Sequence, residues 1–485
     1  MAKKSIQAKG TGKYQAVLKK VLTKITPSKK DKAKLESISK KVLGECGEQA
    51  KKYNGSAMLA GSITRDTWIN GKMEFDVFVL FPESMSVKTL ETIGLKIGKV
   101  VMKKMRGKHR IEYAQHPYVC GKLQGVDIDI VPCFEVKSTE TLKSAVDRTP
   151  FHVHYIVKHL PPAASGDVRL LKQFLRAIGA YGADAKTEGF SGFVCELLAI
   201  NYGSFMDVLK AVTKWQPGQI IDMERFYHDD EHHKLKKQYK QPLILIDPTD
   251  KKRNAAAAIS AENFYRFIKA SKKFLAKPSE QSFFADEKQP ITQCELVMRQ
   301  VKRRSELLLV TFKPPSVVPD ILWPQLRSFA DRLQSILEET RNEFKVLRKA
   351  VYTNESDLAA VLIEMEVSKL PIVQKRVGPK FFDMDDSQRF LDKYKKQATA
   401  GPFIEDENWC VELRRKYVTA REKLIESLDE NAKILKAKGI PGFVAEQLAK
   451  KYELVMDNER IMQLVKQDKN FGIFLRQYFE KESLV

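Results

Sequence analysis

Apolar residues recur at helical spacing in some segments of the chain and alternate with polar residues in others. Residues 15–53 and 85–105 have the helical spacing, and Ser86 is a candidate N-cap for the second segment. Residues 74–81 and 118–134 have the spacing of strands. A helix, a strand, a helix and a strand in this order predict a compact α/β unit of about 130 residues.

The pattern is mostly helical from residue 150 to about residue 278. One helix there has an apolar face formed by Leu170, Leu171, Phe174, Leu175 and Ile178. Its basic face is formed by Arg169, Lys172, Gln173 and Arg176. Ser191 is a candidate N-cap for the next helix, over residues 193–200. We therefore expect a second, predominantly helical unit.

A mixed pattern follows, in which residues 306–313 predict a strand that stops at a proline pair and residues 321–339 predict a helix. Residues 344–352 and 358–368 predict two strands joined by a segment with hairpin-loop composition. This β-α-β-β order predicts the core of a ferredoxin-like or RNA-recognition-like sandwich, although the RNP aromatic signature is absent. The remaining predicted elements are a helix over 387–394, a strand over 409–413, and helices over 418–428, 442–454 and 458–467.

The chain of 485 residues is long enough for about three domains. Its 84 lysines and arginines against 61 acids give a net charge of +23, and its 43% hydrophobic content excludes wholesale disorder. The surplus of positive charge predicts a polyanionic partner such as a nucleic acid, and we expect the N-terminal segment 1–14 to be a basic, flexible extension.

The six cysteines are scattered without a C-x-x-C pair, so we predict neither a zinc module nor a disulfide framework. No apolar run approaches the roughly 18 residues that a membrane-spanning helix requires. The basic N-terminus also lacks the apolar region of a secretory signal. We expect a cytoplasmic protein with no membrane contact.

A pair of acids gives the strongest chemical indication. Glu74 and Asp76 lie two residues apart in a predicted strand, so their carboxylates share one face about 7 Å apart. They either face water or bind a cation between them, and Mg²⁺ is the cation that prefers such ligands. Just upstream, Ser62 in a glycine-containing turn and the guanidinium of Arg65 can hold a phosphate tail near that metal ion.

A third carboxylate comes from the later strand, in which Asp127 and Asp129 again share one face. Only one of the two needs to point into the site, and we expect Asp129. Three such carboxylates predict two-metal phosphoryl transfer, in which one ion activates a hydroxyl and the other stabilises the leaving group.

The motifs occur in a recognisable order along nearly the whole chain. They are Gly61-Ser62-x-x-Arg65-x-Thr67-Trp68, Glu74-Phe75-Asp76, Val131-Pro132-Cys133, Arg148-Thr149-Pro150-Phe151-His152, Arg169-Leu170-Leu171-Lys172, Tyr181-Gly182-Ala183, Gly189-Phe190-Ser191-Gly192, Asp247-Pro248-x-Asp250-x-x-Arg253-Asn254 and Gly401-Pro402-Phe403. The series resembles the polymerase-beta-like nucleotidyltransferase superfamily, in the form carried by class I (archaeal-type) CCA-adding enzymes, which are tRNA nucleotidyltransferases.

The resemblance implies a multidomain α+β fold. It comprises a polymerase-beta-like nucleotidyltransferase head over 15–150, a helical, nucleotide-binding neck over 151–280, a ferredoxin-like body over 281–370 and 431–485, and an α/β tail over 371–430. It also implies an enzyme that adds C, C and A from CTP and ATP to the tRNA 3′ end with Mg²⁺ as cofactor, and a possible homodimer.

The resemblance further implies the site residues. Glu74, Asp76 and Asp129 would be the catalytic, metal-binding carboxylates. The triphosphate would be held by Ser62, Arg65, His152, Lys172 and Tyr181, and Arg253 would recognise the incoming base. Asp66 departs from the family pattern and would weaken an anion site unless it points away.

Each of these residues also has a plainer interpretation: Lys172 as a solvated lysine, His152 as a packed histidine, Tyr181 as a core ring and Arg253 as part of a surface charge run. Two rival functions remain open on the same motifs. One is a poly(A) polymerase or oligoadenylate-synthetase-like transferase, and the other is a catalytically inactive RNA-binding protein. An unaltered set of three carboxylates favours an active enzyme.

Overall fold

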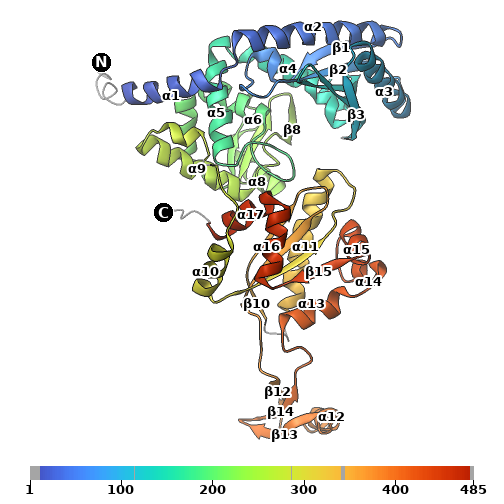
Figure 1. Ribbon diagram of the computed structural model, residues 1–485, viewed down its shortest axis with the longest axis vertical. Helices are drawn as coiled ribbons and strands as arrows, with labels where there is room; N and C mark the ends of the chain where they lie inside the picture. Colours follow the sequence, from blue (N-terminus) through green and yellow to red (C-terminus); the bar gives the residue numbers. More distant parts are fainter. Residues whose placement is uncertain (1–10, 114, 286, 340–343, 481–485) are drawn as a thin grey trace. The chain divides into compact units, whose positions relative to one another are not determined.

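The computed structural model describes residues 11–113, 115–285, 287–339 and 344–480 (Figure 1). The chain divides into two compact units, Met1–Asp286 and Glu287–Val485. Most of the predicted basic extension lies outside the described residues, and the first described helix is α1 (Thr11–Ile25). The predicted helical segment 15–53 is two helices, because Pro27 interrupts it and Ser28 caps α2 (Lys29–Lys51).

The head of the first unit is a five-stranded sheet. Its strands are β1 (Ser56–Ala60), β2 (Glu74–Pro82), β3 (Lys108–Tyr113), β4 (Pro117–Leu123) and β5 (Val126–Glu135), in the order β1-β2-β5-β4-β3. Only β2 and β5 run parallel. The predicted strand 118–134 is two strands that turn at Gln124 and Gly125, both with positive φ, 52° and 81°. The sequence pattern did not predict β1 and β3.

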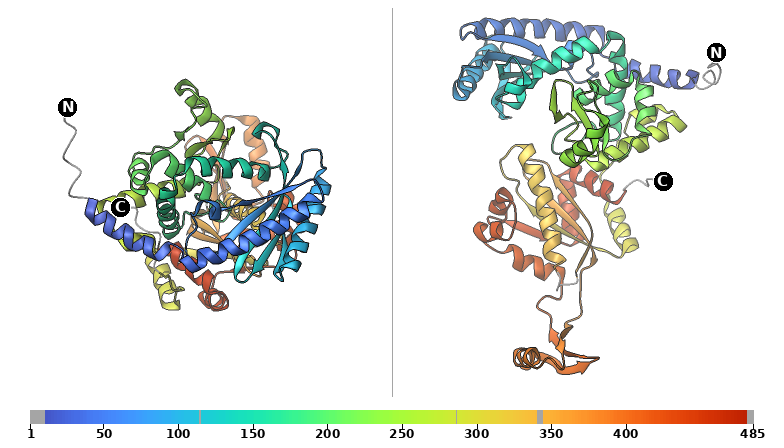
Figure 2. Two further views of the ribbon diagram at one scale, coloured as in Figure 1. Left: turned by 90° about the horizontal axis from the view of Figure 1, so that it is seen from above. Right: turned by 180° about the vertical axis from the view of Figure 1, so that it is seen from behind.

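Helices α2 and α3 (Val87–Lys104) cover one face of this sheet, and Figure 2 shows α2 (blue) along its length. Phe75 and Val77 of β2 join Ile128 and Ile130 of β5 in the core beneath these helices. Since side chains alternate along a strand, the acids between these residues project from the opposite face. This alternation places the candidate carboxylates on the face that α2 and α3 leave open.

The neck is mostly helical, as predicted. Its helices are α1, α4 (Thr149–His159), α5 (Ser165–Ala177), α6 (Gly192–Tyr202), α7 (Phe205–Val212), α8 (His232–Tyr239) and α9 (Ala261–Ala276). A small sheet that was not predicted, in the order β6-β7-β8, is formed by β6 (Gln219–Ile221), β7 (Leu243–Asp247) and β8 (Asp250–Asn254). Helix α1 packs into this neck core through Val21 and Ile25 rather than into the head.

Among the described residues, no single helix is long and apolar enough to cross a membrane. The bent pair α6 and α7 passes that test only when the two helices are taken together. Most of the apolar side chains of this pair lie in the neck core, including Val194, Leu197, Phe205 and Leu209.

The second unit contains a four-stranded antiparallel sheet in the order β10-β11-β9-β15. Its strands are β9 (Glu306–Phe312), β10 (Lys345–Thr353), β11 (Ala359–Val367) and β15 (Tyr452–Val455), and α11 (Pro319–Leu337) connects β9 to β10. This order is that of a ferredoxin-like sandwich, so the predicted β-α-β-β core is confirmed. The predicted helix 442–454 is in fact α15 (Gly442–Leu448) followed by β15.

Helices cover both faces of this sheet. Helix α11 packs with α13 (Ala420–Leu428), α14 (Ala432–Ala437) and α15 on one face. Helices α10 (Gln293–Arg303), α16 (Asn458–Gln467) and α17 (Lys469–Phe479) pack on the other. Helix α13, which falls within the predicted tail range, therefore lies in the core of the body.

A second, smaller sheet has the order β12-β14-β13 and carries α12 (Met384–Tyr394) on one side. Its strands are β12 (Val373–Lys380), β13 (Ala398–Glu405) and β14 (Asn408–Arg414). Short 3₁₀ helices complete the elements: η1 (Ser62–Arg65), η2 (Thr139–Thr141), η3 (Ala145–Arg148), η4 (Pro162–Ala164), η5 (Asp229–Glu231) and η6 (Glu280–Phe283).

We predict that Phe174→Ala strongly destabilises the neck. Phe174 is 1% exposed, and its ring meets those of Phe205, Phe267, Phe274 and Phe283. Removing this ring leaves a cavity that costs about 3–5 kcal/mol of unfolding free energy. Hydrogen exchange of α5 and α9 peptides measures the loss. Phe443→Ala, at a ring that is 41% exposed in the second unit, is the control, and equal effects of both changes would contradict the prediction.

Candidate active site

The three predicted carboxylates lie on one face of the head sheet. Asp76 of β2 is the direct register partner of Asp129 on the parallel strand β5, and Glu74 is the partner of Asp127. Gly61 lies at the end of β1 with φ +82°, and a Cβ at this position would stand 3.0 Å from Asp76 Oδ2. The glycine therefore lets the β1–η1 turn approach the Asp76 carboxylate closely.

The three predicted carboxylates on this face are partly buried and repel one another. Burial, together with the negative charges of Asp129 and Glu74, raises the pKa of Asp76 to about 7. Burial and the charge of Glu74 also raise the pKa of Asp129. Oxygen ligands that repel one another in this way are the donor set that a hard divalent cation stabilises, so these residues fit such an ion.

The carboxylates are not gathered into a closed cage. Glu74 Oε2 lies 2.6 Å from Lys72 Nζ. Within the part of the chain that the structure describes, no group of three or more histidine, cysteine or acidic side chains is close enough to hold a metal ion. In this structure Glu74 is paired with Lys72 rather than gathered with Asp76 and Asp129 into a preformed metal site.

The structure distinguishes the two acids of β5. Asp127 is exposed and lies 3.5 Å from Lys122 Nζ, whereas Asp129 is partly buried. Asp129 is also the acid whose charge acts on Asp76 most strongly. These contacts favour Asp129 over Asp127 as the third carboxylate.

The predicted phosphate-binding cations converge on a buried acid of α6. Glu196 lies 3.1 Å from Arg65 Nη2 and 3.4 Å from Lys172 Nζ, and it accepts a 2.6 Å hydrogen bond from Thr67 Oγ1. Burial would raise the pKa of Glu196, but the charges of Lys172 and Arg65 outweigh it and lower the pKa. Glu196 therefore holds both cations in a fixed position, a role that the sequence did not predict.

The plainer interpretation of Lys172 as a solvated lysine is wrong. The Lys172 side chain is only 4% exposed and donates to the Thr67 hydroxyl at 3.1 Å. Arg169 is also buried; it donates to the Trp68 carbonyl at 2.9 Å and pairs with Asp66 at 2.6 Å. Because Asp66 pairs with Arg169 and also with Lys32, its negative charge is neutralised rather than opposed to an anion.

Tyr181 lies beside this cluster. A Cβ on Gly192, at the start of α6, would lie 3.3 Å from the Tyr181 hydroxyl and 3.6 Å from Lys172 Nζ. The Arg176 guanidinium lies 5.0 Å from the centre of the tyrosine ring, and burial raises the pKa of the hydroxyl. Tyr181 therefore presents a protonated hydroxyl close to the lysine and to the N-terminus of α6.

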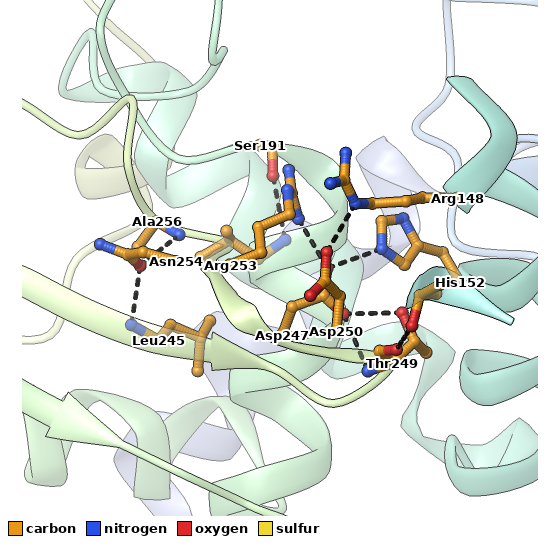
Figure 3. A network of polar contacts seen from close by, with 12 residues as sticks. Arg148, His152, Ser191, Leu245, Asp247, Thr249, Asp250, Arg253, Asn254 and Ala256 are labelled. Carbon is orange, nitrogen blue, oxygen red and sulfur yellow. Dashed lines mark hydrogen bonds and ion pairs between the residues drawn. The ribbon is translucent and has the colours of Figure 1, made fainter. Parts of the chain in front are cut away.

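His152 and Arg253 meet at a second buried acid, Asp247 (Figure 3). Asp247 Oδ2 lies 2.8 Å from His152 Nε2 and 2.7 Å from Arg253 Nη1, while its Oδ1 accepts from the backbone and hydroxyl of Thr249. Burial would raise the pKa of this fully buried carboxyl, but His152 and the other donors hold it well below its usual range. The His152 ring also stacks on Phe193 at 4.0 Å.

A cleft of about 1020 Å³ opens beside this network. Its walls include Arg148, Ser191, Phe226, Tyr239 and Arg253, but not the three carboxylates. Arg148 pairs with Asp250 at 2.9 Å at one edge of the cleft (Figure 3). The cleft is large enough for a nucleotide, and it exposes part of the Arg253 side chain.

We predict that Asp76→Asn stabilises the metal-free protein at pH 8. The Asp76 carboxyl has a higher pKa in the folded state, about 7, than its ordinary value of 3.8. Stability is therefore lost as the pH rises between these values, and asparagine avoids that loss. We expect the melting temperature in EDTA to rise by about 5 °C at pH 8 and to be unchanged below pH 4. Asp127→Asn is the matched control, and an unchanged melting temperature of Asp76→Asn at pH 8 would contradict the prediction.

Comparisons with known proteins cover both units. Residues 166–284 match the family model of the tRNA nucleotidyltransferase second domain, and residues 303–457 match that of the CCA-adding enzyme C-terminal domain. Residues 13–149 match the Second Messenger Oligonucleotide or Dinucleotide Synthetase domain. These matches assign a nucleotidyltransferase fold to the head and neck.

Relatives that align along most of the chain are named CCA-adding enzymes. The chain is 36% identical to the CCA-adding enzyme of Methanosarcina mazei over 462 residues, which cover 94% of this chain and 97% of the relative. It is 37% identical to that of Methanocaldococcus jannaschii over 388 residues, 79% of this chain and 84% of the relative. It is 32% identical to that of Haloarcula marismortui over 96% of this chain and 98% of the relative. The chain therefore belongs to the CCA-adding enzyme family of tRNA nucleotidyltransferases.

Proposed function

We propose that this protein adds C, C and A to the 3′ end of tRNA, without a nucleic-acid template and with CTP and ATP as substrates. The proposal is carried by the pairing of Asp76 with Asp129 on parallel strands, where Gly61 lets the β1–η1 turn approach the Asp76 carboxylate. The shared name of relatives that align along nearly the whole chain supports the choice of substrate.

In this proposal Glu74, Asp76 and Asp129 hold divalent cations, which we take to be Mg²⁺. When bound, these ions would lower the pKa of the attacking hydroxyl and neutralise charge on the triphosphate. The oxygen of the tRNA 3′-hydroxyl forms a bond to the α-phosphorus, and the bond from that phosphorus to the β-phosphate oxygen breaks to release pyrophosphate. We assign the acceptance of the hydroxyl proton to Asp129.

The cation clusters of the neck suit the nucleotide. Lys172, Arg65 and the Tyr181 hydroxyl would donate to the triphosphate, together with Ser62 in η1. Glu196 cancels one of the two positive charges of Arg65 and Lys172, so the pair keeps a net charge of about +1 for an anion. His152 and Arg253 are both oriented by Asp247, and we assign the triphosphate to His152 and the base to Arg253.

The net charge of +23 suits an RNA partner that is bound through its phosphates. We propose that the body, including α13, and the tail bind the acceptor stem and T arm of the tRNA. A cytoplasmic location and a homodimer remain predictions from the sequence.

The rival poly(A) polymerase and oligoadenylate-synthetase-like transferases share the motifs of the head. The head of this chain matches the Second Messenger Oligonucleotide or Dinucleotide Synthetase domain. Two observations favour CCA addition over them: the family match of the C-terminal domain and the relatives that align over 94% of the chain. A catalytically inactive RNA-binding protein is disfavoured because the three carboxylates and the glycine turn are all present.

We predict that Glu74→Gln, Asp76→Asn and Asp129→Asn each lower nucleotide incorporation by more than about 100-fold, because each removes a negative ligand of the proposed metal ions. Binding of tRNA, measured by filter retention, should stay within about twofold. Asp127→Asn is the matched control on the same strand face and should retain activity. Near-normal turnover of any of the three variants would refute the metal assignment.

The order of nucleotide addition distinguishes the proposal from its rivals. A tRNA that ends at its discriminator base should gain two residues with CTP alone. With CTP and ATP together it should gain three, with the last an A, and then stop. The addition of a run of A residues with ATP alone would identify a poly(A)-type transferase. If the wild-type protein extends the tRNA with neither nucleotide, the result would favour the catalytically inactive RNA-binding protein.

A further inference from the structure

The strand that carries Arg253 departs from regular pairing. In the β7–β8 hairpin, Asp247 is the register partner of Asp250, and Ile246 is the partner of Asn254. One step along β7 therefore corresponds to four steps along β8, which leaves Lys251, Lys252 and Arg253 as a bulge without partners on β7. A bulge redirects side chains and is common next to active sites, but the ladder itself cannot hold its backbone.

Two tyrosine hydroxyls hydrogen-bond to the backbone of this bulge, in place of the missing hydrogen bonds between the strands. The Tyr227 hydroxyl donates to the Lys251 carbonyl at 2.7 Å, and the Tyr239 hydroxyl donates to the Lys252 carbonyl at 2.7 Å. These are the carbonyls of the two residues directly before Arg253. Burial raises the pKa of both hydroxyls, so both stay protonated donors at neutral pH.

The tyrosines themselves are anchored. Tyr239 ends α8, and the backbone N–H of Tyr227 donates to Asp222 Oδ2 at 2.9 Å. Both rings pack against a small core formed by Leu235, Ile244 and Ile246. The two hydroxyls therefore connect the bulge to a rigid base built from α8 and β7.

Arg253 is thus restrained from two directions. Asp247 binds its guanidinium at 2.7 Å, and the tyrosines hold the backbone from which its side chain starts. Both Arg253 and Tyr239 line the cleft of about 1020 Å³. Discrimination between bases through hydrogen bonds needs a donor group held in one place, because a mobile guanidinium can adapt to the wrong base.

We propose that Tyr227 and Tyr239 are positioning residues that set nucleotide selectivity by holding the Arg253 bulge in place. This inference rests on the proposed function, since it takes Arg253 as the residue that recognises the base. The reacting groups lie on β2 and β5 of the head, so the tyrosines should affect the choice of nucleotide more than the maximal rate.

The test compares Tyr227→Phe, Tyr239→Phe and the double variant, each of which removes only hydroxyl groups. The measured quantity is kcat/KM for CTP divided by kcat/KM for UTP, on a tRNA that ends at its discriminator base. We expect this ratio to fall about 3- to 10-fold in each single variant and further in the double variant. The kcat at saturating CTP should change by less than about twofold.

Tyr14→Phe is the matched control, because the Tyr14 hydroxyl also donates to a backbone carbonyl, that of Leu275, at 2.7 Å in the same unit. The ratio of kcat/KM for CTP to kcat/KM for UTP in Tyr14→Phe should equal that of the wild type. A ratio measured on one preparation does not depend on the folded fraction, so lost stability alone cannot lower it. Hydrogen exchange of residues 250–255 gives a readout without catalysis and should be faster in Tyr227→Phe and Tyr239→Phe, fastest in the double variant, and unchanged in Tyr14→Phe.

Arg253→Ala separates the inference from the proposed function. In this background the tyrosine changes should lower the ratio no further. If Arg253→Ala lowers the ratio but the tyrosine variants do not, the positioning role is overturned and the proposed function stands. If Arg253→Ala leaves the ratio unchanged, both the base-recognition role of Arg253 and the positioning role are refuted. If the wild type adds no C to this tRNA, the proposed function itself fails.

Discussion

The repulsion between Asp76 and Asp129 is the interaction on which the site depends. Hydrogen bonding between two parallel strands brings these acids into register, and burial keeps water from screening them. Burial first, and then the charges of Asp129 and Glu74, raise the pKa of Asp76. A protein that only needed a stable sheet would have no reason to retain two acids at this pair, so the strain points to a ligand that carries positive charge.

Two buried acids of the neck behave in the opposite way. Glu196 and Asp247 each meet three cationic or hydrogen-bonding partners, and their pKa values are lowered rather than raised. Both acids lie in the neck and orient the side chains proposed to bind the nucleotide. Burial and like charges raise the pKa values of Asp76 and Asp129 in the head, whereas Glu196 and Asp247 fix the positions of cationic side chains from the head and the neck. This arrangement suits a metal-bound triphosphate, because the acids of the head can face the positive ions and the cationic side chains can face the negative phosphates.

The comparison of sequence with structure separates two kinds of feature. The alternation in residues 74–81 predicted β2, and the β-α-β-β order predicted the ferredoxin-like body, because long periodic segments state which face is buried. Strands β1, β3, β6–β8, β12, β13 and β15 were not predicted. β1 and β6 are too short to show a period, and β3 and β8 consist largely of exposed polar residues that obtain their partners only from other strands. Asp247 and Glu196 were missed as site residues because a buried acid looks like any other acid until its partners are known.

The sequence by itself determined the chemistry available to this protein: three acids at strand spacing, a glycine turn before them, and an ordered series of motifs that identifies the family. Tertiary structure alone decided which acids face one another, that Lys172 and Arg169 are buried, and that Arg253 lies on a bulge held by two tyrosines. The physical reason is that strand register and burial bring together residues separated by tens to more than a hundred positions. The local pattern of either segment contains no record of its distant partner.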